Sequence, residues 1–161
     1  MKYENAFGLK SVCLRYFNAA GADESGVIGE RHSPETHLIP ILLQVASGRR
    51  DRAFIFGTDY PTPDGTCIRD YVHVSDLCEA HMVALEYLNK NQKSRNFNLG
   101  NGDGFSVAEI VATVEKITGV KLHLDYTDRR DGDPAILVAD STLAKQILHW
   151  SPRFPQLETI I

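Results

Sequence analysis

The sequence predicts an α/β fold in which short parallel strands alternate with helices. Residues Ser11–Phe17 carry apolar side chains on both faces, a pattern typical of a strand inside a covered parallel sheet. Residues 95–126 read as strand, glycine loop, helix and strand, which is the element order of a βαβ unit. Boundary signals for helices, above all capping residues and terminating glycines, recur along the chain. Together these observations indicate the α/β class.

Composition indicates one globular domain. The 161 residues are 43% apolar, enough for a hydrophobic core, and the net charge of −4 comes from interspersed acids and bases. This balance argues against a nucleic-acid surface, which usually needs a basic face. Cys13, Cys67 and Cys78 form no CxxC pattern, and the six histidines show no metal spacing, so neither disulfides nor a metal site is expected. The cysteine pattern fits a reducing cytoplasm best, and no apolar run suits a membrane span or a signal peptide.

The amino-terminal third is predicted to contain a helix end, a strand and a longer helix. Met1–Ala6 reads as the end of a helix whose start is missing, since a terminating glycine follows it. Asn18 follows the strand Ser11–Phe17 at its carboxyl end, where open α/β sheets bind ligands, although a simple turn residue would look the same. A long loop covers residues 19–35, and a helix is expected over Leu38–Ser47.

The stretch from Phe56 to Leu77, FGTDYPTPDGTCIRDYVHVSDL, organises the chain around a tight loop. A short strand over Ala53–Phe56 leads into prolines, aspartates and glycines that force the backbone to turn. Asp70–Val74 alternates polar and apolar residues as a half-buried strand does. The next helix is expected over Asp76–Asn89, opened by the preceding serine.

Arg69 stands where this loop enters the strand. A guanidinium held there by its neighbours is suited to a bidentate grip on phosphate or carboxylate, because its planar fork is pre-organised. Structural ion pairs are commoner than anion sites, so pairing of Arg69 with Asp70 or another local acid is the alternative interpretation. The residues alone leave both open.

The second half repeats the alternation of strand and helix around a glycine loop. A strand is predicted over Arg95–Leu99, the loop GNGDG follows, and Ser106 opens a capping box for a helix over Val107–Thr118. A strand over Lys121–Tyr126 completes the unit, and Asp125 falls about where a ribose-binding acid would. The glycines read GxGxG and not GxGxxG, so a tight turn feeding a helix is favoured over a dinucleotide-binding loop.

Two arginines and two aspartates, RRDGD at residues 129–133, precede a short strand over Ile136–Val138. These charges could neutralise one another, or they could offer a guanidinium to a phosphate and a carboxylate to a ribose hydroxyl. Asp140 is expected to cap a helix over Ser141–Leu148, and Trp150 is expected to pack in the core.

The stretch FGTDYPTPDGTCIRDYVHVSDL resembles the signature of UDP-glucose 4-epimerases, which belong to the extended short-chain dehydrogenase/reductase family. It includes turn residues that no generic fold demands, which makes the likeness specific. Further matches to this family are LRYFNAAGA, GERHSPETHLIP, FNLGNGDGFSV and RRDGDPAILVAD, so that nearly the whole chain is covered.

The resemblance implies that residues 1–161 hold the carboxy-terminal part of a Rossmann-type sheet together with the smaller α/β substrate-binding domain. Strands around Leu14 and Phe97 would then have open edges and uncovered apolar faces, which predicts association in solution. The chain contains neither the amino-terminal glycine fingerprint nor a Tyr-x-x-x-Lys pair. No catalytic residue is therefore assigned, and the chain is expected to be inactive alone.

Enzymes that this chain resembles bind NAD, mainly on their amino-terminal part, and a UDP-hexose. A tyrosine deprotonates the sugar 4-hydroxyl while hydride passes from C4 to NAD⁺, and the 4-keto sugar takes the hydride back on its other face. The full-length enzyme is expected to be a homodimer. Two alternatives stand beside this interpretation: a non-catalytic nucleotide-sugar-binding module, and a sister UDP-sugar 4-epimerase.

The resemblance also implies site residues, position by position. For the cofactor, the positions that flank the nicotinamide are Tyr16 and Phe17. For the nucleotide sugar, the matching positions are Asn18, His37 and Leu38 at the diphosphate and nearby sugar, Ala53, Ile55 and Phe56 on the uracil-binding strand, Arg69 and Arg130 as the diphosphate clamp, Asp133 on the ribose, and Leu137 in the hexose pocket. The medium size of Leu137 predicts partial tolerance of N-acetylated sugars.

Overall fold

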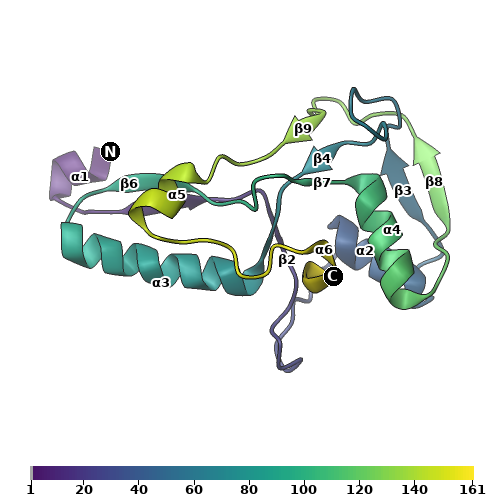
Figure 1. Ribbon diagram of the computed structural model, residues 1–161, viewed down its shortest axis with the longest axis horizontal. Coiled ribbons are helices and arrows are strands. Elements are labelled where there is room, and N and C mark those ends of the chain that lie inside the picture. Colours follow the sequence, from purple (N-terminus) through teal and green to yellow (C-terminus); the bar gives the residue numbers. More distant parts are fainter. Residues whose placement is uncertain (1) are drawn as a thin grey trace.

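The computed structural model describes residues 2–161 and has the predicted mixed α/β architecture (Figure 1). Its strands form four small sheets, and within residues 2–161 every strand pairing is parallel except that of β4 with β7. The molecule is elongated, with a group of helices and strands towards each end of its long axis. Among the described helices, none combines the length and the apolar character that crossing a membrane would require.

One end of the molecule is built around β1 (Val12–Arg15), which pairs in parallel with β6 (Arg95–Asn98). The longest helix, α3 (Val74–Asn91), packs on β1, α5 (Thr142–Ile147) packs on β6, and α1 (Lys2–Phe7) lies at the same end (Figure 1). Buried side chains from these elements form a hydrophobic cluster. We call it the β1–β6 cluster, and its members are Val72, Leu77, Ala80, Ala84, Phe97, Leu99, Ala144, Leu148 and Trp150.

The other end is built around β3 (Ala53–Phe56), which pairs in parallel with β8 (Leu124–Thr127). Helix α2 (Leu38–Ala46) packs against β3 and against α4 (Val107–Thr118), which also contacts α6 (Leu157–Ile160). Their buried side chains form a second cluster. We call it the β3–β8 cluster, and its members are Ile39, Leu42, Val45, Ala53, Tyr71, Ile110, Val114, Leu122, Leu157 and Ile160.

Two small sheets lie between the ends. In one, β2 (Asn18–Ala20) runs parallel to β5 (Tyr71–His73). In the other, β4 (Ile68–Arg69) lies between β7 (Phe105–Ser106), which is antiparallel to it, and β9 (Ile136–Leu137), which is parallel. This second sheet fixes the backbone of the arginine that the sequence singles out.

Two predicted strands are shorter in the structure, and each is adjoined in the chain by an unpredicted strand of another sheet. The strand expected over residues 11–17 ends at Arg15 as β1, and the chain then enters a different sheet as β2. The strand expected over residues 70–74 is β5, and only Asp70 separates it from β4 in another sheet. The sequence pattern missed both passages because strand-like residues continue through the point where the chain changes sheets.

The helix starts show one error and one confirmed prediction. Helix α3 begins earlier than predicted, at Val74, and its N-cap is His73, whose Nδ1 accepts a hydrogen bond from Ser75 N–H at 3.1 Å. The predicted opening at serine was wrong because an imidazole nitrogen takes the acceptor role usually filled by a hydroxyl. Helix α4 has the predicted capping box: Ser106 Oγ accepts from Glu109 N–H at 3.0 Å, and the Glu109 carboxylate accepts from Ser106 N–H at 2.7 Å.

Predictions for the carboxy-terminal part are mostly confirmed. Strand β8 begins later than predicted, because Leu122 is buried in the β3–β8 cluster before the ladder starts. Asp140 Oδ1 accepts a hydrogen bond from Thr142 N–H at 3.0 Å, although the N-cap position itself is Ser141. Trp150 is buried, as predicted, and its Nε1 donates to the backbone oxygen of Asp76 at 3.0 Å.

Strand β1 has β6 as its one partner in the described chain, and its Cys13 and Arg15 are exposed. The open edge expected for this strand is therefore confirmed, and so is an uncovered face, the one that carries Cys13 and Arg15. Large apolar side chains are exposed on this half of the fold: Tyr3, Phe7, Leu9, Tyr16, Phe17, Met82 and Leu85.

Candidate functional site

The guanidinium of Arg69 is the best-held charged group of the candidate site. Its Nη1 donates to Ile68 O at 2.9 Å and to Pro134 O at 2.8 Å, and its side chain is only 12% exposed. Its Nη2 lies 3.3 Å from Asp133 Oδ1, an ion-pair distance, but it is buried and makes no hydrogen bond within the described chain. Arg69 therefore has a fixed orientation and one donor that lacks a well-aligned acceptor.

Arg130 is the second arginine of the candidate site. Its guanidinium carbon lies 3.8 Å from the centre of the Phe56 ring, which is a close cation–π contact. Its backbone oxygen accepts a hydrogen bond from Asp133 N–H at 3.2 Å. The structure thus brings Arg69, Arg130, Asp133 and Phe56 into one continuous set of contacts.

Strand β3 presents its residues in two different ways. Ala53 N–H donates to His123 O at 3.0 Å and Gly57 N–H donates to Thr127 O at 2.9 Å, so these groups point towards β8. Because successive backbone groups of a strand alternate in direction, those of Phe54 and Phe56 point to the other edge. That edge pairs with no strand in the described chain. The side chains of Ala53 and Ile55 are buried, so neither residue offers its backbone or its side chain to the open edge.

Arg129 is a structural residue. Its Nε donates to Asp59 Oδ1 at 2.7 Å, a further bond joins its Nη2 to Asp59 O, and its guanidinium lies over the Tyr60 ring at 4.4 Å. The hydrogen bond from Arg129 lowers the pKa of Asp59 from its ordinary value. The four charges of RRDGD therefore do not simply neutralise one another, because Arg129 pairs with Asp59 and Asp133 pairs with Arg69.

Tyr60 is a buried polar residue that the sequence analysis missed. Its ring is 5% exposed, and its hydroxyl makes no hydrogen bond within the described residues. Burial raises the pKa of the Tyr60 phenol, and burial likewise raises the pKa of the Cys67 thiol. The sequence signal for the burial of Tyr60 was an aromatic residue within a polar turn, because an exposed ring there would gain nothing from packing.

The glycine loop wraps around a second missed residue, Asp70. This carboxylate is fully buried and accepts hydrogen bonds from Asn101 N–H at 2.9 Å and from Ala139 N–H at 3.1 Å. A Cβ atom on Gly100 would lie 2.2 Å from Asp70 Oδ2, so only glycine fits there. The run GNGDG is thus shaped by a protein carboxylate, which supports the tight-turn interpretation. Asp125 is paired with Arg52 at 2.9 Å.

Within residues 2–161, the remaining predicted residues make no hydrogen bond or ion pair to Arg69, Arg130 or Asp133. Asn18 Nδ2 donates to Asp70 O at 2.8 Å, while Tyr16 and Phe17 are exposed beside it in the chain. His37 is the N-cap residue of α2, but its side chain contacts Glu35 instead of the helix. Among residues 2–161, no hydrogen bond, ion pair or ring contact joins His37 to either Arg69 or Arg130. Leu38 and Leu137 are half-buried.

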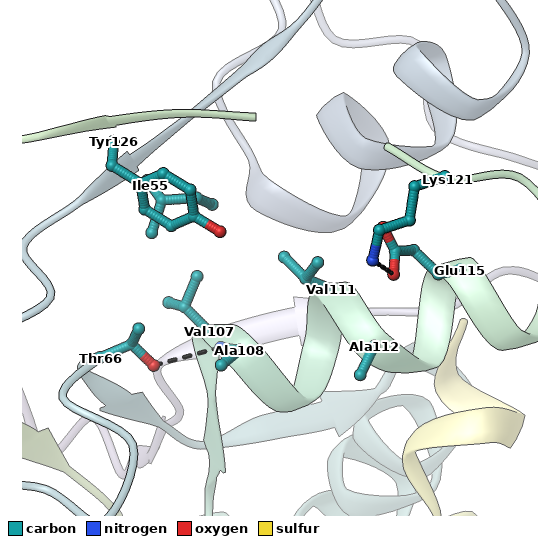
Figure 2. Close-up of a pocket in the computed structure, with 9 residues that line it drawn as sticks. All are labelled: Ile55, Thr66, Val107, Ala108, Val111, Ala112, Glu115, Lys121 and Tyr126. Atoms are coloured by element: carbon teal, nitrogen blue, oxygen red, sulfur yellow. Dashed lines mark hydrogen bonds and ion pairs between the residues drawn. The ribbon is translucent and has the colours of Figure 1, made fainter. Parts of the chain in front are cut away.

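One hollow of the described surface lies beside β3. It encloses about 220 Å³ between α4 and the β3–β8 pair, and Figure 2 shows Val107 and Val111 pointing into it from the helix and Ile55 and Tyr126 from the strands. The Lys121–Glu115 ion pair closes one side. Since neither Arg69 nor Arg130 lines it, this hollow is separate from the arginine site.

The parallel strand pairs, with two arginines held at the loops beside them, define an α/β protein with a candidate anion site. The chain belongs to the NAD dependent epimerase/dehydratase family, whose pattern matches residues 1–100. It is 57% identical over 158 residues to the UDP-glucose 4-epimerase of Halalkalibacterium halodurans, an alignment that covers 98% of this chain and 47% of that protein.

Two solved structures are similar to the fold as well as to the sequence. UDP-glucose 4-epimerase from Brucella ovis in complex with NAD matches with a TM-score of 0.95 and 48% identity, over 99% of this chain and 49% of that one. The Bifidobacterium longum enzyme in complex with NAD⁺ and UDP matches with a TM-score of 0.90 and 35% identity, over 99% of this chain and 48% of that one. The chain spans about half the length of the relatives it matches, and its fold is of their Rossmann type.

Proposed function

We propose that this chain supplies the nucleotide-sugar half of an NAD-dependent UDP-glucose 4-epimerase. The observation that carries the proposal is the Arg69 guanidinium, which is nearly buried, anchored through Nη1 and left with an unsatisfied Nη2. A buried donor without an acceptor costs free energy, so an arriving anionic oxygen would relieve that cost. The diphosphate of a UDP-sugar offers such an oxygen and suits the planar fork of arginine.

Arg130 is the second diphosphate ligand on this proposal. Its guanidinium is exposed and stacked on Phe56, and its N–H groups make no hydrogen bond to the described chain. Stacking limits the freedom of the side chain, so less entropy is lost when the guanidinium binds phosphate. Asn18, His37 and Leu38 would complete the diphosphate and sugar contacts, as their resemblance to the family positions implies.

The open edge of β3 is the place we propose for the uracil ring. Phe54 and Phe56 direct backbone N–H and C=O groups to this edge, and uracil carries complementary carbonyl acceptors and an N–H donor. This moves the base contacts from Ala53 and Ile55, which are turned towards β8 and the core, to Phe54 and Phe56. Asp133 Oδ2, the oxygen that does not face Arg69, would then accept a ribose hydroxyl.

The cofactor contacts fall at the end of β1. Tyr16 and Phe17 are 40% and 47% exposed, so their rings are free to pack beside a nicotinamide, and in that respect they fit NAD. NAD would supply the hydride acceptor at the sugar C4. This chain's own residues would orient the UDP-hexose, with Leu137 beside the hexose. On the same resemblance, the longer enzyme is proposed to be a cytoplasmic homodimer.

Calorimetry with UDP tests the nucleotide-sugar site on the chain as it stands. UDP is expected to bind, and Arg69→Ala is expected to weaken binding by about tenfold to about a hundredfold, the worth of charge-assisted hydrogen bonds. Arg69→Lys should not restore affinity, because an ammonium group lacks the bidentate fork. Arg49→Ala, on an exposed arginine in the turn after α2, is the matched control. No UDP binding, or equal binding by Arg69→Ala, would overturn the proposal.

A turnover assay tests the division of labour. The sequence has no Tyr-x-x-x-Lys pair to accept the 4-hydroxyl proton, so the chain with added NAD and UDP-glucose is expected to form no UDP-galactose. UDP binding without turnover supports a nucleotide-sugar-binding half, whereas turnover by the chain would contradict it. Calorimetry with UDP-GlcNAc beside UDP-glucose tests the proposed tolerance at Leu137, and an affinity for UDP-GlcNAc no better than for UDP alone would refute that tolerance.

A further inference from the structure

The loop before α2 gathers two imidazoles around one carboxylate. Glu35 Oε1 lies 2.9 Å from His37 Nδ1 and 3.6 Å from His32 Nδ1, and the centres of the two imidazole rings are 4.8 Å apart. One candidate ligand atom from each residue lies within 4.8 Å of the other two. In the part of the chain that the structure describes, no other group of three His, Cys, Asp or Glu side chains converges in this way.

We propose that His32, Glu35 and His37 form a binding site for a divalent transition-metal ion of the Zn²⁺ type. Two imidazole nitrogens and one carboxylate oxygen are a donor set that such ions prefer, and three protein ligands leave a fourth position open. Tetrahedral ligand atoms at about 2.0–2.2 Å from zinc lie about 3.4 Å from one another. The two measured spacings to Glu35 lie on either side of that value, so small side-chain shifts complete the site.

Hydrogen bonds within the loop hold Glu35 in place, but they do not use every group that could bind a metal ion. Glu35 Oε1 accepts from the Thr36 and His37 backbone N–H groups, each at 2.8 Å, as well as from the His37 ring. His32 makes no hydrogen bond in the described chain, although its ring packs beside that of His37. Glu35 Oε2 also makes none. Within the described residues, the His32 ring and Glu35 Oε2 therefore make no hydrogen bond that metal binding would have to break.

The carboxylate is already prepared for a cation. Its side chain is only 10% exposed, and the backbone N–H groups of Thr36 and His37 each donate to Glu35 Oε1 at 2.8 Å. The backbone bonds fix the carboxylate before any ion arrives, which reduces the ordering cost of binding. His32 and His37 are exposed, so an ion can reach them from solvent.

The site lies in the loop between β2 and α2. Figure 1 shows the segment that follows β2 extending away from the body of the molecule before the chain returns to α2. The ligand spacing H-x₂-E-x-H matches neither a helix face nor a strand face, which is why no metal site was expected from the spacing of the histidines. The loop, and not a regular element, brings the three groups together, and His37 is the one residue that this site shares with the proposed nucleotide-sugar contacts.

Metal titration of the whole chain tests the proposal. We expect one Zn²⁺ to bind per chain by calorimetry, and we expect Co²⁺ in its place to show the intense visible absorption bands of a site of low coordination number. His32→Ala and Glu35→Gln are each expected to weaken Zn²⁺ binding by at least about tenfold, because the loss of a group that only hydrogen-bonds to a metal ligand already costs that much. His123→Ala, which removes an exposed histidine outside the cluster, is the matched control and should bind as the parent does.

Both test variants lie in an exposed loop, so circular dichroism should show an unchanged fold. Glu35→Gln keeps the shape of the side chain and an acceptor for the backbone N–H groups, which separates the metal role from the role of a loop brace. Stoichiometric binding that His32→Ala and Glu35→Gln leave intact would place the ion elsewhere and overturn the proposal. Absence of Zn²⁺ binding by the parent chain would overturn it as well.

Discussion

The β3–β8 cluster and the β1–β6 cluster differ in how fully the chain encloses them. In the β3–β8 cluster, helices α2 and α4 pack against the strands so that Leu42, Ile110 and Val114 are fully buried. In the β1–β6 cluster, α3 buries one side while Met82 and Leu85 on the same helix are 60% and 52% exposed. The difference teaches that the enclosed β3–β8 cluster supports the arginine site. The partly open β1–β6 cluster instead lies beside Tyr16 and Phe17.

A buried carboxylate joins the two regions and gives the largest expected effect. Asp70→Ala removes the acceptor for the N–H groups of Asn101 and Ala139 and leaves both donors unsatisfied inside the protein. The free energy of unfolding is expected to fall by about 4 kcal/mol, as for other broken buried charged networks. Urea unfolding followed by circular dichroism measures this loss. Asp103→Ala, on an exposed acid in the neighbouring loop, is the control. Equal stability of the two variants would show that Asp70 does not hold the two clusters together.

A cavity in the closed core tests whether the two regions unfold together. Leu42→Ala is expected to lower the free energy of unfolding by about 3 kcal/mol, because Leu42 is fully buried. Trp150 is the chain's one tryptophan and lies in the opposite cluster, so its fluorescence reports on the β1–β6 end. We expect fluorescence and circular dichroism to give the same shifted urea midpoint.

The control for this cavity is Leu85→Ala, which shortens a half-exposed side chain on α3 and should change the midpoint little. If the fluorescence midpoint stays at the parent value while the circular dichroism midpoint moves, the two clusters unfold separately. The β1–β6 and β3–β8 clusters would then be two units that fold independently of each other.

The tight loop beside the arginines has a smaller, pH-dependent effect. Burial raises the pKa of Asp64, but hydrogen bonds from the Ser106 hydroxyl and from the Thr66 N–H and hydroxyl lower it more, so its pKa is below the ordinary value. The stabilisation is therefore complete above the ordinary pKa of an aspartate, and it is lost as pH falls through the folded-state pKa. Asp64→Asn should flatten this part of the pH dependence.

Urea midpoints measured between about pH 6 and about pH 3 cover the ordinary titration range of aspartate. The Asp64→Asn profile should fall less steeply than the parent profile towards acid pH. Asp103→Asn removes a carboxylate without such bonds and should keep the parent slope. If both variants show the same slope, the Asp64 hydrogen bonds do not set the acid stability of this loop.

The smallest effect is expected at the surface of the closed core. Arg52 and Asp125 form an ion pair at 2.9 Å, but both side chains are largely exposed to solvent. Exposed pairs gain little because water and salt screen them. Arg52→Ala should therefore leave the urea midpoint unchanged within error. A loss as large as that of Leu42→Ala would mean that this pair, and not apolar packing, holds β3 to β8.

Sequence patterns within one turn or strand predicted most helices and strands. The arrangement of the candidate site depends instead on contacts between segments far apart in the sequence. Ser106 and its partner three residues later gave the capping box correctly, because both ends of that interaction lie in one turn. Alternation placed Asp70 in a half-buried strand, since nothing local shows that Gly100 and Ala139 close over it. Likewise Phe54, and not Ala53, faces the open edge of β3, because the side on which β8 pairs is set by residues about seventy positions away.

Two of the points at which the chain passes from one sheet to another are neighbours in space, one before β2 and one at Asp70, and these two passages are tied by the β2–β5 ladder and by the Asn18 side chain. A single connecting strand could swivel, but two bonded ones can rotate only by shearing their ladder. We therefore expect the angle between the two ends to be preset before any ligand arrives. Fluorophore pairs that span the ends should report one narrow separation with and without UDP.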